Sequence, residues 1–191
     1  MPSRSQHAGR THQAIVQVFL DAATERGVDG TSVSEVMRRA GLNRGTFYEY
    51  FSDINDLIVQ VEDELLDDFR AHAHKVARLQ GHLERQTAAD GVARFLTQHD
   101  GRIYLLLSSK GDPCFVPRFR DALAENFQTI FGDSLGLRYP QYAVAAISSA
   151  VVGVLNRWYD GGCREPLTEV VSELQDVWLT GIERLRGNQQ G

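Results

Sequence analysis

The stretch AGLNRGTFYEYF, residues 40–51, contains the signals that end one helix and begin another. Gly41 follows an amphipathic segment, and glycine readily adopts the left-handed conformation that closes a helix. Asn43 precedes a segment rich in aromatic residues, and asparagine is a preferred residue at a helix N-cap. The stretch therefore predicts that one helix ends near Ala40 and that a second helix covers 44–50.

The residues before this stretch have the apolar spacing of helices. Side chains separated by three and four residues form one face of a helix that ends near Gly27. That face consists of Ile15, Val18, Phe19, Ala22 and Ala23. A shorter set follows Ser32, which forms a capping box with Glu35. Its members are Val33, Val36, Met37 and Ala40. Two short helices joined by Ala-Gly-Leu-Asn indicate a helix-turn-helix.

The residues after this stretch also have helical spacing, and the alternation typical of strands does not recur. Ser52 or Asp53 can cap a long helix that ends at Gly81. Its apolar stripe consists of Ile54, Leu57, Ile58, Val61, Leu65, Phe69 and Val76. Further helix starts are predicted at Thr87, about residue 101, Asp112-Pro113, Pro140 and Pro166.

These signals predict the fold class and the division into domains. We expect an all-α chain of about nine helices. Residues 1–52 would form a three-helix domain that contains the helix-turn-helix, and residues 53–191 a larger C-terminal helical domain. The helix from about residue 53 would link the two.

The composition is typical of a soluble globular protein, with 42% apolar and 24% charged residues in 191. The net charge of −5 excludes a uniformly basic nucleic-acid binder, although residues 1–52 carry six arginines against five acidic residues. Two cysteines make no disulfide framework. The N-terminus lacks the apolar core of a signal peptide, and the longest near-apolar run is too short to span a bilayer. We therefore expect a cytoplasmic protein.

The residues of the second short helix suit contact with DNA. In a helix-turn-helix the second helix enters the major groove, and its first residues meet base edges. Arg44 can bind guanine through two hydrogen bonds, and Thr46 can contact a thymine methyl group or a phosphate. Gly45 lets the helix approach the DNA backbone closely. Tyr48 and Tyr50 can donate hydrogen bonds to phosphate oxygens.

A purely structural interpretation also accounts for part of this pattern. Phe47 and Phe51 lie four residues apart, so we expect them to point inward and hold the helix to its neighbours. Tyr48 could pack on the surface, and Arg44 could be a solvated charge. The two short helices would then be a structural corner without a DNA-binding role.

The segment from Thr31 to Leu57 resembles the DNA-binding signature of the TetR (tetracycline-repressor-like) family. The matching residues are Thr31-Ser32-Val33, Ala40-Gly41, Arg44-Gly45-Thr46-Phe47-Tyr48, Phe51 and Leu57. Residues 108–115 and 153–158 resemble one subgroup of TetR regulatory domains more weakly. The resemblance implies an all-helical homodimer that binds a palindromic DNA operator, usually as a repressor. It also implies release of the operator when an effector binds the C-terminal domain.

The resemblance assigns roles to individual residues. The base-reading positions would be Asn43, Arg44 and Thr46. The phosphate-contacting positions would be Ser32, Ser34, Tyr48 and Tyr50. Family members commonly have a lysine where this chain has Ile54, which is flanked by Asp53 and Asp56. We expect weaker and more salt-sensitive DNA binding as a result. The same departure motivates an alternative: a helical ligand- or protein-binding module whose helix-turn-helix no longer reads DNA.

The C-terminal domain has candidates for a ligand cavity and for a dimer interface. The cavity candidates are Phe69, Phe95, Tyr104, Phe115, Phe119, Phe127 and Trp158. They could equally form an ordinary aromatic core, and the effector could be a small molecule or a protein. The dimer candidates are Ala145, Ser149, Val152, Gly153, Leu174, Trp178 and Ile182. Two such helices per subunit would form a four-helix interface, unless these faces pack only within one subunit.

The sequence gives little support for an enzyme. It contains no glycine-rich phosphate loop after a strand and no nucleophile elbow. His72 and His74 lie two residues apart and so face different sides of a helix. We expect no catalytic residue, no cofactor and no metal site.

Overall fold

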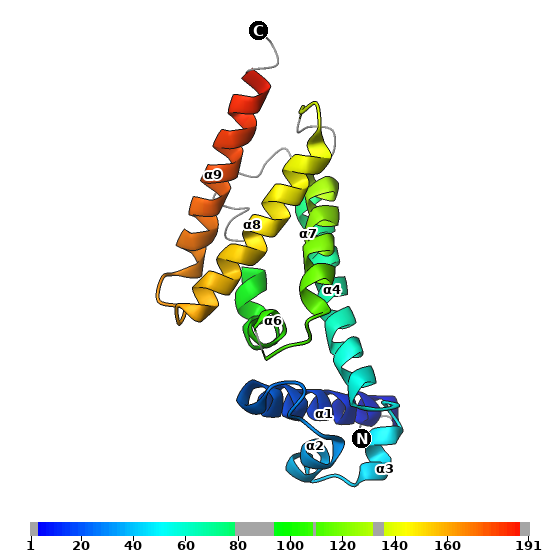
Figure 1. The fold of residues 1–191 in the computed structure, drawn as a ribbon. Coiled ribbons are helices and arrows are strands. Elements are labelled where there is room, and N and C mark those ends of the chain that lie inside the picture. The colour runs from blue at the N-terminus through cyan, green and yellow to red at the C-terminus, as the bar shows by residue number, and fades with distance from the viewer. Residues whose placement is uncertain (1–3, 79–93, 109, 132–135, 188–191) are drawn as a thin grey trace. The chain divides into compact units, whose positions relative to one another are not determined.

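The protein is represented by a computed structural model that describes residues 4–78, 94–108, 110–131 and 136–187. The described residues contain eight labelled helices, and none of them forms a strand, which confirms the all-α prediction. The helices are α1 (Arg4–Arg26), α2 (Val33–Ala40), α3 (Arg44–Tyr48), α4 (Ile54–Arg78), α6 (Asp100–Leu107), α7 (Phe115–Phe131), α8 (Pro140–Asp160) and α9 (Leu167–Gly187) (Figure 1). The helix end predicted at Gly81 and the start predicted at Thr87 lie outside the described residues.

The chain divides into two compact units. Unit 1 consists of Met1–Leu65 and Gly101–Phe115, and unit 2 consists of Leu66–Asp100 and Val116–Gly191. Packing therefore joins α6 and the first part of α4 to the helix-turn-helix. The functional boundary near residue 52 stays a prediction, because it concerns what each part does.

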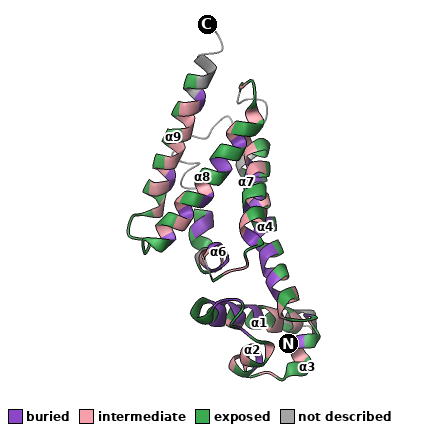
Figure 2. Cartoon of the chain, viewed as in Figure 1, coloured by how far each residue is buried: buried purple, intermediate pink, exposed green. Residues whose placement is uncertain are grey.

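The core of unit 1 contains the apolar face predicted for α1. Ile15, Phe19, Ala22 and Ala23 are all 0% exposed. Phe47 and Phe51 are also buried, with ring centroids 5.2 Å apart, which confirms that both point inward. Figure 2 shows buried residues along α1 and on the part of α4 that belongs to this unit.

The turn between α2 and α3 forms through the predicted caps. The Ser32 hydroxyl accepts a hydrogen bond from the Glu35 amide at 3.3 Å and so caps α2. Gly41 closes α2 with a φ of 67°, in the left-handed region where glycine has no steric penalty. The Asn43 side chain then caps α3 by accepting from the Thr46 amide at 3.0 Å. α3 itself is shorter than the predicted 44–50 and ends at Tyr48.

The start of α4 resolves the choice between Ser52 and Asp53. Asp53 Oδ1 accepts from the Asp56 amide at 2.9 Å, so Asp53 is the N-cap. Asp56 Oδ2 accepts in return from the Ser52 amide at 2.7 Å. This backbone hydrogen bond and a side-chain hydrogen bond from Gln60 Nε2 lower the pKa of Asp56. Both carboxylates therefore have structural roles at the helix start.

The turn after α6 is tied to the end of α1 inside unit 1. Lys110 Nζ donates to the Thr24 carbonyl at 2.9 Å, and the Val28 amide donates to the Lys110 carbonyl at 2.8 Å. Gly111 lies so close to α6 that an added Cβ would be 2.5 Å from the Leu105 carbonyl oxygen. A side chain at this position would therefore push the turn away from α6.

α7 starts two residues later than Asp112-Pro113 predicted. The Asp112 carboxylate accepts from the Cys114 amide at 2.8 Å, and its carbonyl accepts from the Phe115 amide at 3.0 Å. These bonds form a turn before the helix, which begins at Phe115. Pro140, in contrast, is the first residue of α8, as predicted.

Unit 2 combines the rest of α4, a helical segment at 94–98, and helices α7, α8 and α9. One apolar cluster contains Val144 and Ile147 of α8 with Ile182 of α9, and Phe127 and Trp178 pack against it. A second group stacks aromatic rings, with Phe69 5.2 Å from Phe95 and 5.3 Å from Phe119.

Candidate nucleic-acid interface and ligand cavity

The front of α3 is organised by the Asn43 cap. Asn43 Oδ1 accepts from the backbone amide and, at 3.3 Å, from the hydroxyl of Thr46. Its amide nitrogen remains the group that can reach outward as a donor. A Cβ at Gly45 would lie 3.0 Å from Asn43 Oδ1, which is tighter than an ordinary contact. The absence of a side chain at Gly45 therefore leaves room for the Asn43 cap.

Arg44 and Tyr48 form the exposed face of α3. They are one helical turn apart, and Arg44 Nη2 donates to the Tyr48 hydroxyl at 3.4 Å. Tyr48 is 53% exposed. The edge of its ring packs on the buried Phe47 ring, with centroids 5.5 Å apart. The pair therefore presents a guanidinium and a hydroxyl group on a helix that the buried Phe47 ring anchors to the core.

Tyr50 has a different environment from Tyr48. It is half-buried, and its ring lies 5.9 Å from the His12 ring of α1 and 6.4 Å from Phe51. The ring therefore links the end of the helix-turn-helix to α1. Ser32 and Ser34 are exposed at the start of α2, where the Ser32 hydroxyl already serves as the cap.

An arginine network that the sequence analysis missed fixes α2 against α1. Arg39 binds Glu25 of α1 at 2.7 Å and Glu35 of α2 at 2.7 Å, and Arg38 binds Glu35 at 3.0 Å. The hydrogen bonds from Arg39 lower the pKa of both carboxyl groups. The four-residue spacing of Glu35 and Arg39 could have indicated their ion pair from the sequence. The contact of Arg39 with Glu25 depends on the packing of two helices, so no sequence pattern indicates it.

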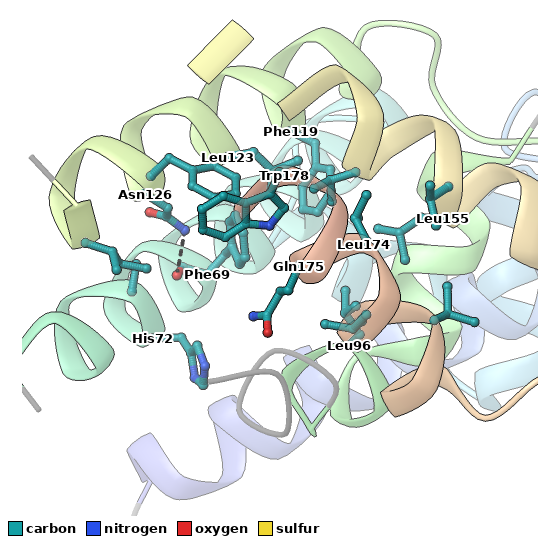
Figure 3. A pocket seen from close by; sticks show the side chains of 17 residues that line it. Phe69, His72, Leu96, Phe119, Leu123, Asn126, Leu155, Leu174, Gln175 and Trp178 are labelled. Carbon is teal, nitrogen blue, oxygen red and sulfur yellow. Dashed lines mark hydrogen bonds between the residues drawn. The ribbon is translucent and has the colours of Figure 1, made fainter. Parts of the chain in front are cut away.

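Unit 2 contains a cavity of about 130 Å³. Its walls come from α4, the segment at 94–98, α7, α8 and α9 (Figure 3). Most of the lining is apolar. These side chains are Phe69, Ala73, Leu96, Phe119, Leu123, Phe127, Ile130, Val151, Val154, Leu155, Val170, Val171, Leu174 and Trp178.

Three uncharged polar side chains complete the lining: His72, Asn126 and Gln175. Asn126 Nδ2 donates to the Phe69 carbonyl at 3.2 Å, so the orientation of its amide is set (Figure 3). Burial lowers the pKa of His72, and the positive charges of Lys75 and Arg94 lower it further. His72 is therefore neutral at neutral pH. Its Nε2 is buried without a hydrogen-bond partner among the described residues.

The seven aromatic residues predicted for a ligand cavity fall in different places. Phe69, Phe119 and Phe127 line the cavity, and Phe95 packs behind it on Phe69 and His72. Tyr104 and Phe115 belong to unit 1, where Phe115 is fully buried. Trp158 donates from Nε1 to the Glu165 carbonyl at 3.0 Å, in the connection between α8 and α9. The aliphatic lining from α8 and α9 was missed, because its spacing does not differ from that of ordinary core.

The predicted dimer residues also divide into two groups. Ala145, Ser149 and Gly153 are exposed on one face of α8. The other four are used inside unit 2. Val152 and Ile182 are buried, and Leu174 and Trp178 line the cavity. α9 in addition exposes Val177, whose side chain is 71% accessible.

Two further features bear on function within the described residues. No group of three or more His, Cys, Asp or Glu side chains among them could hold a metal ion. None of the described helices is long and apolar enough to cross a membrane.

Comparison with known proteins places the chain in a family. The family model "Bacterial regulatory proteins, tetR family" matches residues 18–61, and the model "Transcriptional regulator C-terminal region" matches residues 87–179. The HTH-type transcriptional regulator YvdT of Bacillus subtilis (strain 168) is 33% identical over 72 residues, or 38% of this chain and 34% of that protein. The HTH-type transcriptional regulator AcrR of Shigella flexneri is 38% identical over 56 residues, or 29% of this chain and 26% of that protein. The matched segments thus span less than two thirds of either relative.

Solved structures share the fold over nearly the whole chain. The fatty acid degradation regulator FadR from Bacillus halodurans superposes with a TM-score of 0.66 at 17% identity, covering 90% of this chain and 95% of that one. The dihydroxyacetone kinase operon activator DhaS has a TM-score of 0.63 at 18% identity, covering 92% and 97%. The family consists of transcription regulators and not of enzymes. Because the two family models match the N-terminal and the C-terminal parts of the chain, the chain belongs to the TetR family of helix-turn-helix transcriptional regulators.

Proposed function

We propose that this TetR-family regulator binds a DNA operator through α3. The observation that carries the proposal is the exposed pair of Arg44 and Tyr48 on a helix capped by Asn43. Asn43, Arg44 and Thr46 would read base edges, and Gly45 would allow the close approach. Ser32, Ser34, Tyr48 and Tyr50 would contact phosphates, which fix the position of the helix in the groove.

The alternative function, a helical module that no longer reads DNA, was motivated by Ile54 and by the neighbouring Asp53 and Asp56. The hydrogen bonds of the two carboxylates support a simpler explanation, because Asp53 caps α4 and Asp56 binds the Ser52 amide. Neither acidic residue therefore requires a loss of function. Ile54 still stands where family members commonly have a lysine, so we expect one phosphate contact fewer and weaker binding. Because each phosphate contact adds to the salt dependence, the loss should lower the salt dependence, which corrects the greater salt sensitivity expected from the sequence.

The operator would be palindromic and the protein a homodimer. The exposed face of α8 with Ala145, Ser149 and Gly153 supports this, because small side chains let a second helix approach closely. Val177 on α9 adds an exposed apolar side chain that a partner could cover. Two copies of α3 would then read half-sites about one DNA turn apart.

The unit 2 cavity would receive the effector. A space of about 130 Å³ that is lined mainly by apolar side chains with a few polar groups supports a role in binding a small molecule. Effector binding would favour a conformation in which the two recognition helices no longer fit successive major grooves. DhaS is an operon activator, but repression is the usual action in the family, and we propose for this chain that it represses transcription in the cytoplasm.

A fluorescence-anisotropy titration against the intergenic DNA that flanks the gene would test this function. The account predicts binding on the order of 10³-fold tighter than to random DNA of equal length, with an affinity that falls as salt rises. Light scattering should give twice the chain mass of 21.4 kDa. Equal affinity for both DNAs across all flanking sequence, or a monomer bound to DNA, would contradict the proposal.

A further inference from the structure

We propose that the unit 2 cavity takes an uncharged lipophilic molecule with one hydroxyl or carbonyl group, which hydrogen-bonds to His72, Asn126 or Gln175. The inference rests on the proposed effector role of the cavity and adds the chemical class of the ligand. It follows from three properties of the described residues that line the cavity: their apolar area, the absence of charged side chains among them, and the hydrogen-bonding state of their few polar atoms.

The apolar lining determines most of the ligand. Of the seventeen described residues that line the cavity, fourteen have apolar side chains or, for Trp178, a mainly apolar ring. Each methylene group that moves from water into such surroundings gains about 0.8 kcal/mol, which corresponds to roughly a fourfold gain in affinity. A ligand without a substantial hydrocarbon part would leave this area unused.

The described part of the lining offers no charged side chain to an ionic head group, which disfavours a charged ligand. Among the described residues that line the cavity, none is Asp, Glu, Lys or Arg. A carboxylate or ammonium group in the cavity would lose its hydration without a counter-ion. Lys75 and Arg94 have exposed side chains outside the lining, although both act on His72 electrostatically. Burial, together with these positive charges, lowers the pKa of His72, which disfavours the protonated imidazole that would pair with an anionic ligand.

The polar atoms can serve one neutral polar group. His72 Nε2 is buried and lacks a partner among the described residues. Asn126 uses Nδ2 for the Phe69 carbonyl, which leaves Oδ1 as an acceptor. Gln175 offers both a donor and an acceptor, and Figure 3 shows its carboxamide extending from α9 beside the apolar lining. A hydroxyl group both donates and accepts, so it can bond to this set without a charge.

The test is isothermal titration calorimetry of the DNA-free full chain at pH 7.5 with octan-1-ol, octanoate and octylammonium. These probes share one hydrocarbon chain and differ in charge. We expect octan-1-ol to bind at least tenfold more tightly than either ion, and hexan-1-ol to bind roughly tenfold or more weakly than octan-1-ol. Equal or tighter binding of octanoate would overturn the proposal and point to Lys75 and Arg94 as the head-group site. Absence of alcohol binding would overturn it as well.

Variants on α9 test whether octan-1-ol binds in this cavity. Leu174→Phe adds volume inside the lining and should weaken octan-1-ol binding at least tenfold. Thr180→Phe adds the same ring at an exposed position of the same helix outside the lining and should bind like wild type. Gln175→Leu should weaken the alcohol severalfold. Equal affinity in Leu174→Phe and wild type would place the ligand elsewhere and overturn the proposal.

A second readout separates this inference from the proposed function. Calorimetry reports the ligand class without DNA, whereas anisotropy of the operator complex reports the effector role. Alcohol binding that leaves operator affinity unchanged would contradict the regulatory role of the cavity and retain the ligand class. Operator release by octanoate but not by octan-1-ol would retain regulation and overturn the class.

Discussion

Units 1 and 2 use their apolar side chains in opposite ways. In unit 1, Phe19, Phe47 and Phe51 are almost completely enclosed, and the turns around them are capped by polar side chains. In unit 2, Phe69, Phe119 and Phe127 line a cavity of about 130 Å³. A part that reads DNA needs a fixed geometry for its contacting residues, whereas a part that receives a ligand needs space. The difference in packing therefore matches the difference in proposed role.

Removing an aromatic ring from each unit should give the largest difference between the units in lost free energy of unfolding. Phe47→Ala removes a fully buried ring, so we expect a loss of about 3–5 kcal/mol in the free energy of unfolding of unit 1. Phe127→Ala enlarges an existing cavity around a half-buried ring and should cost clearly less. Urea unfolding followed by circular dichroism measures both. Equal losses would show that the two units are packed alike.

Adding volume to each unit should produce effects of opposite sign. Ala22→Val inserts carbon into a closed site in α1 and should destabilise by about 1–3 kcal/mol. Val154→Ile extends into the cavity and should stabilise by up to about 0.8 kcal/mol, the value of one buried methylene group. The same urea experiment distinguishes them. A destabilising Val154→Ile would mean that the cavity has no spare room in solution.

The caps of the helix-turn-helix should contribute less than its core. Asn43→Ala removes the acceptor for the Thr46 amide, so we expect unit 1 to lose about 1 kcal/mol of unfolding free energy. Ser34→Ala changes an exposed residue within α2 and serves as the control, with a change near zero. If Asn43→Ala were as stable as the control, the α3 cap would not contribute to the preorganised front of the helix.

The stability of unit 2 should depend slightly on pH because of His72. Its pKa is lowered in the folded chain, so the unfolded chain takes up the proton first as the pH falls below the ordinary value of 6.5. Stability is therefore full above about pH 6.5 and decreases as the pH falls through the lowered pKa. Urea midpoints between pH 8 and pH 5 should fall less for His72→Gln than for wild type. His74→Gln, at an exposed position, should follow wild type.

The comparison also explains what the sequence could and could not predict. The caps at Ser32, Gly41 and Asn43 act over three or four residues, so their spacing in the chain was sufficient. The cavity depends on how five distant segments pack. Phe115 and Phe119 lie four residues apart in α7 and so belong to the same helical pattern. Phe115 is nevertheless buried in unit 1, whereas Phe119 lines the cavity. No local pattern separates these two outcomes.

Some local sequence signals were compatible with two structures, and only the hydrogen bonds of the folded chain distinguish between them. Asp112-Pro113 can cap a helix directly or form a turn before it, and the hydrogen bond from the Cys114 amide selects the turn. Ser52 and Asp53 were both acceptable caps, and Asp53 takes the role because it accepts from the Asp56 amide. The link between Arg39 and Glu25 joins two helices, so only the packing of α2 on α1 reveals it.

The most direct test of the central claim is operator binding by Arg44→Ala, measured by anisotropy beside wild type and Arg164→Ala. Arg164 is an exposed arginine after α8, so the control loses the same charge far along the chain from α3. We predict that Arg44→Ala weakens operator binding by about 1–3 kcal/mol, roughly 5- to 150-fold, with a much smaller effect on random DNA. Arg164→Ala should bind like wild type. If Arg44→Ala kept the wild-type preference for the operator, α3 would not be the helix that reads DNA.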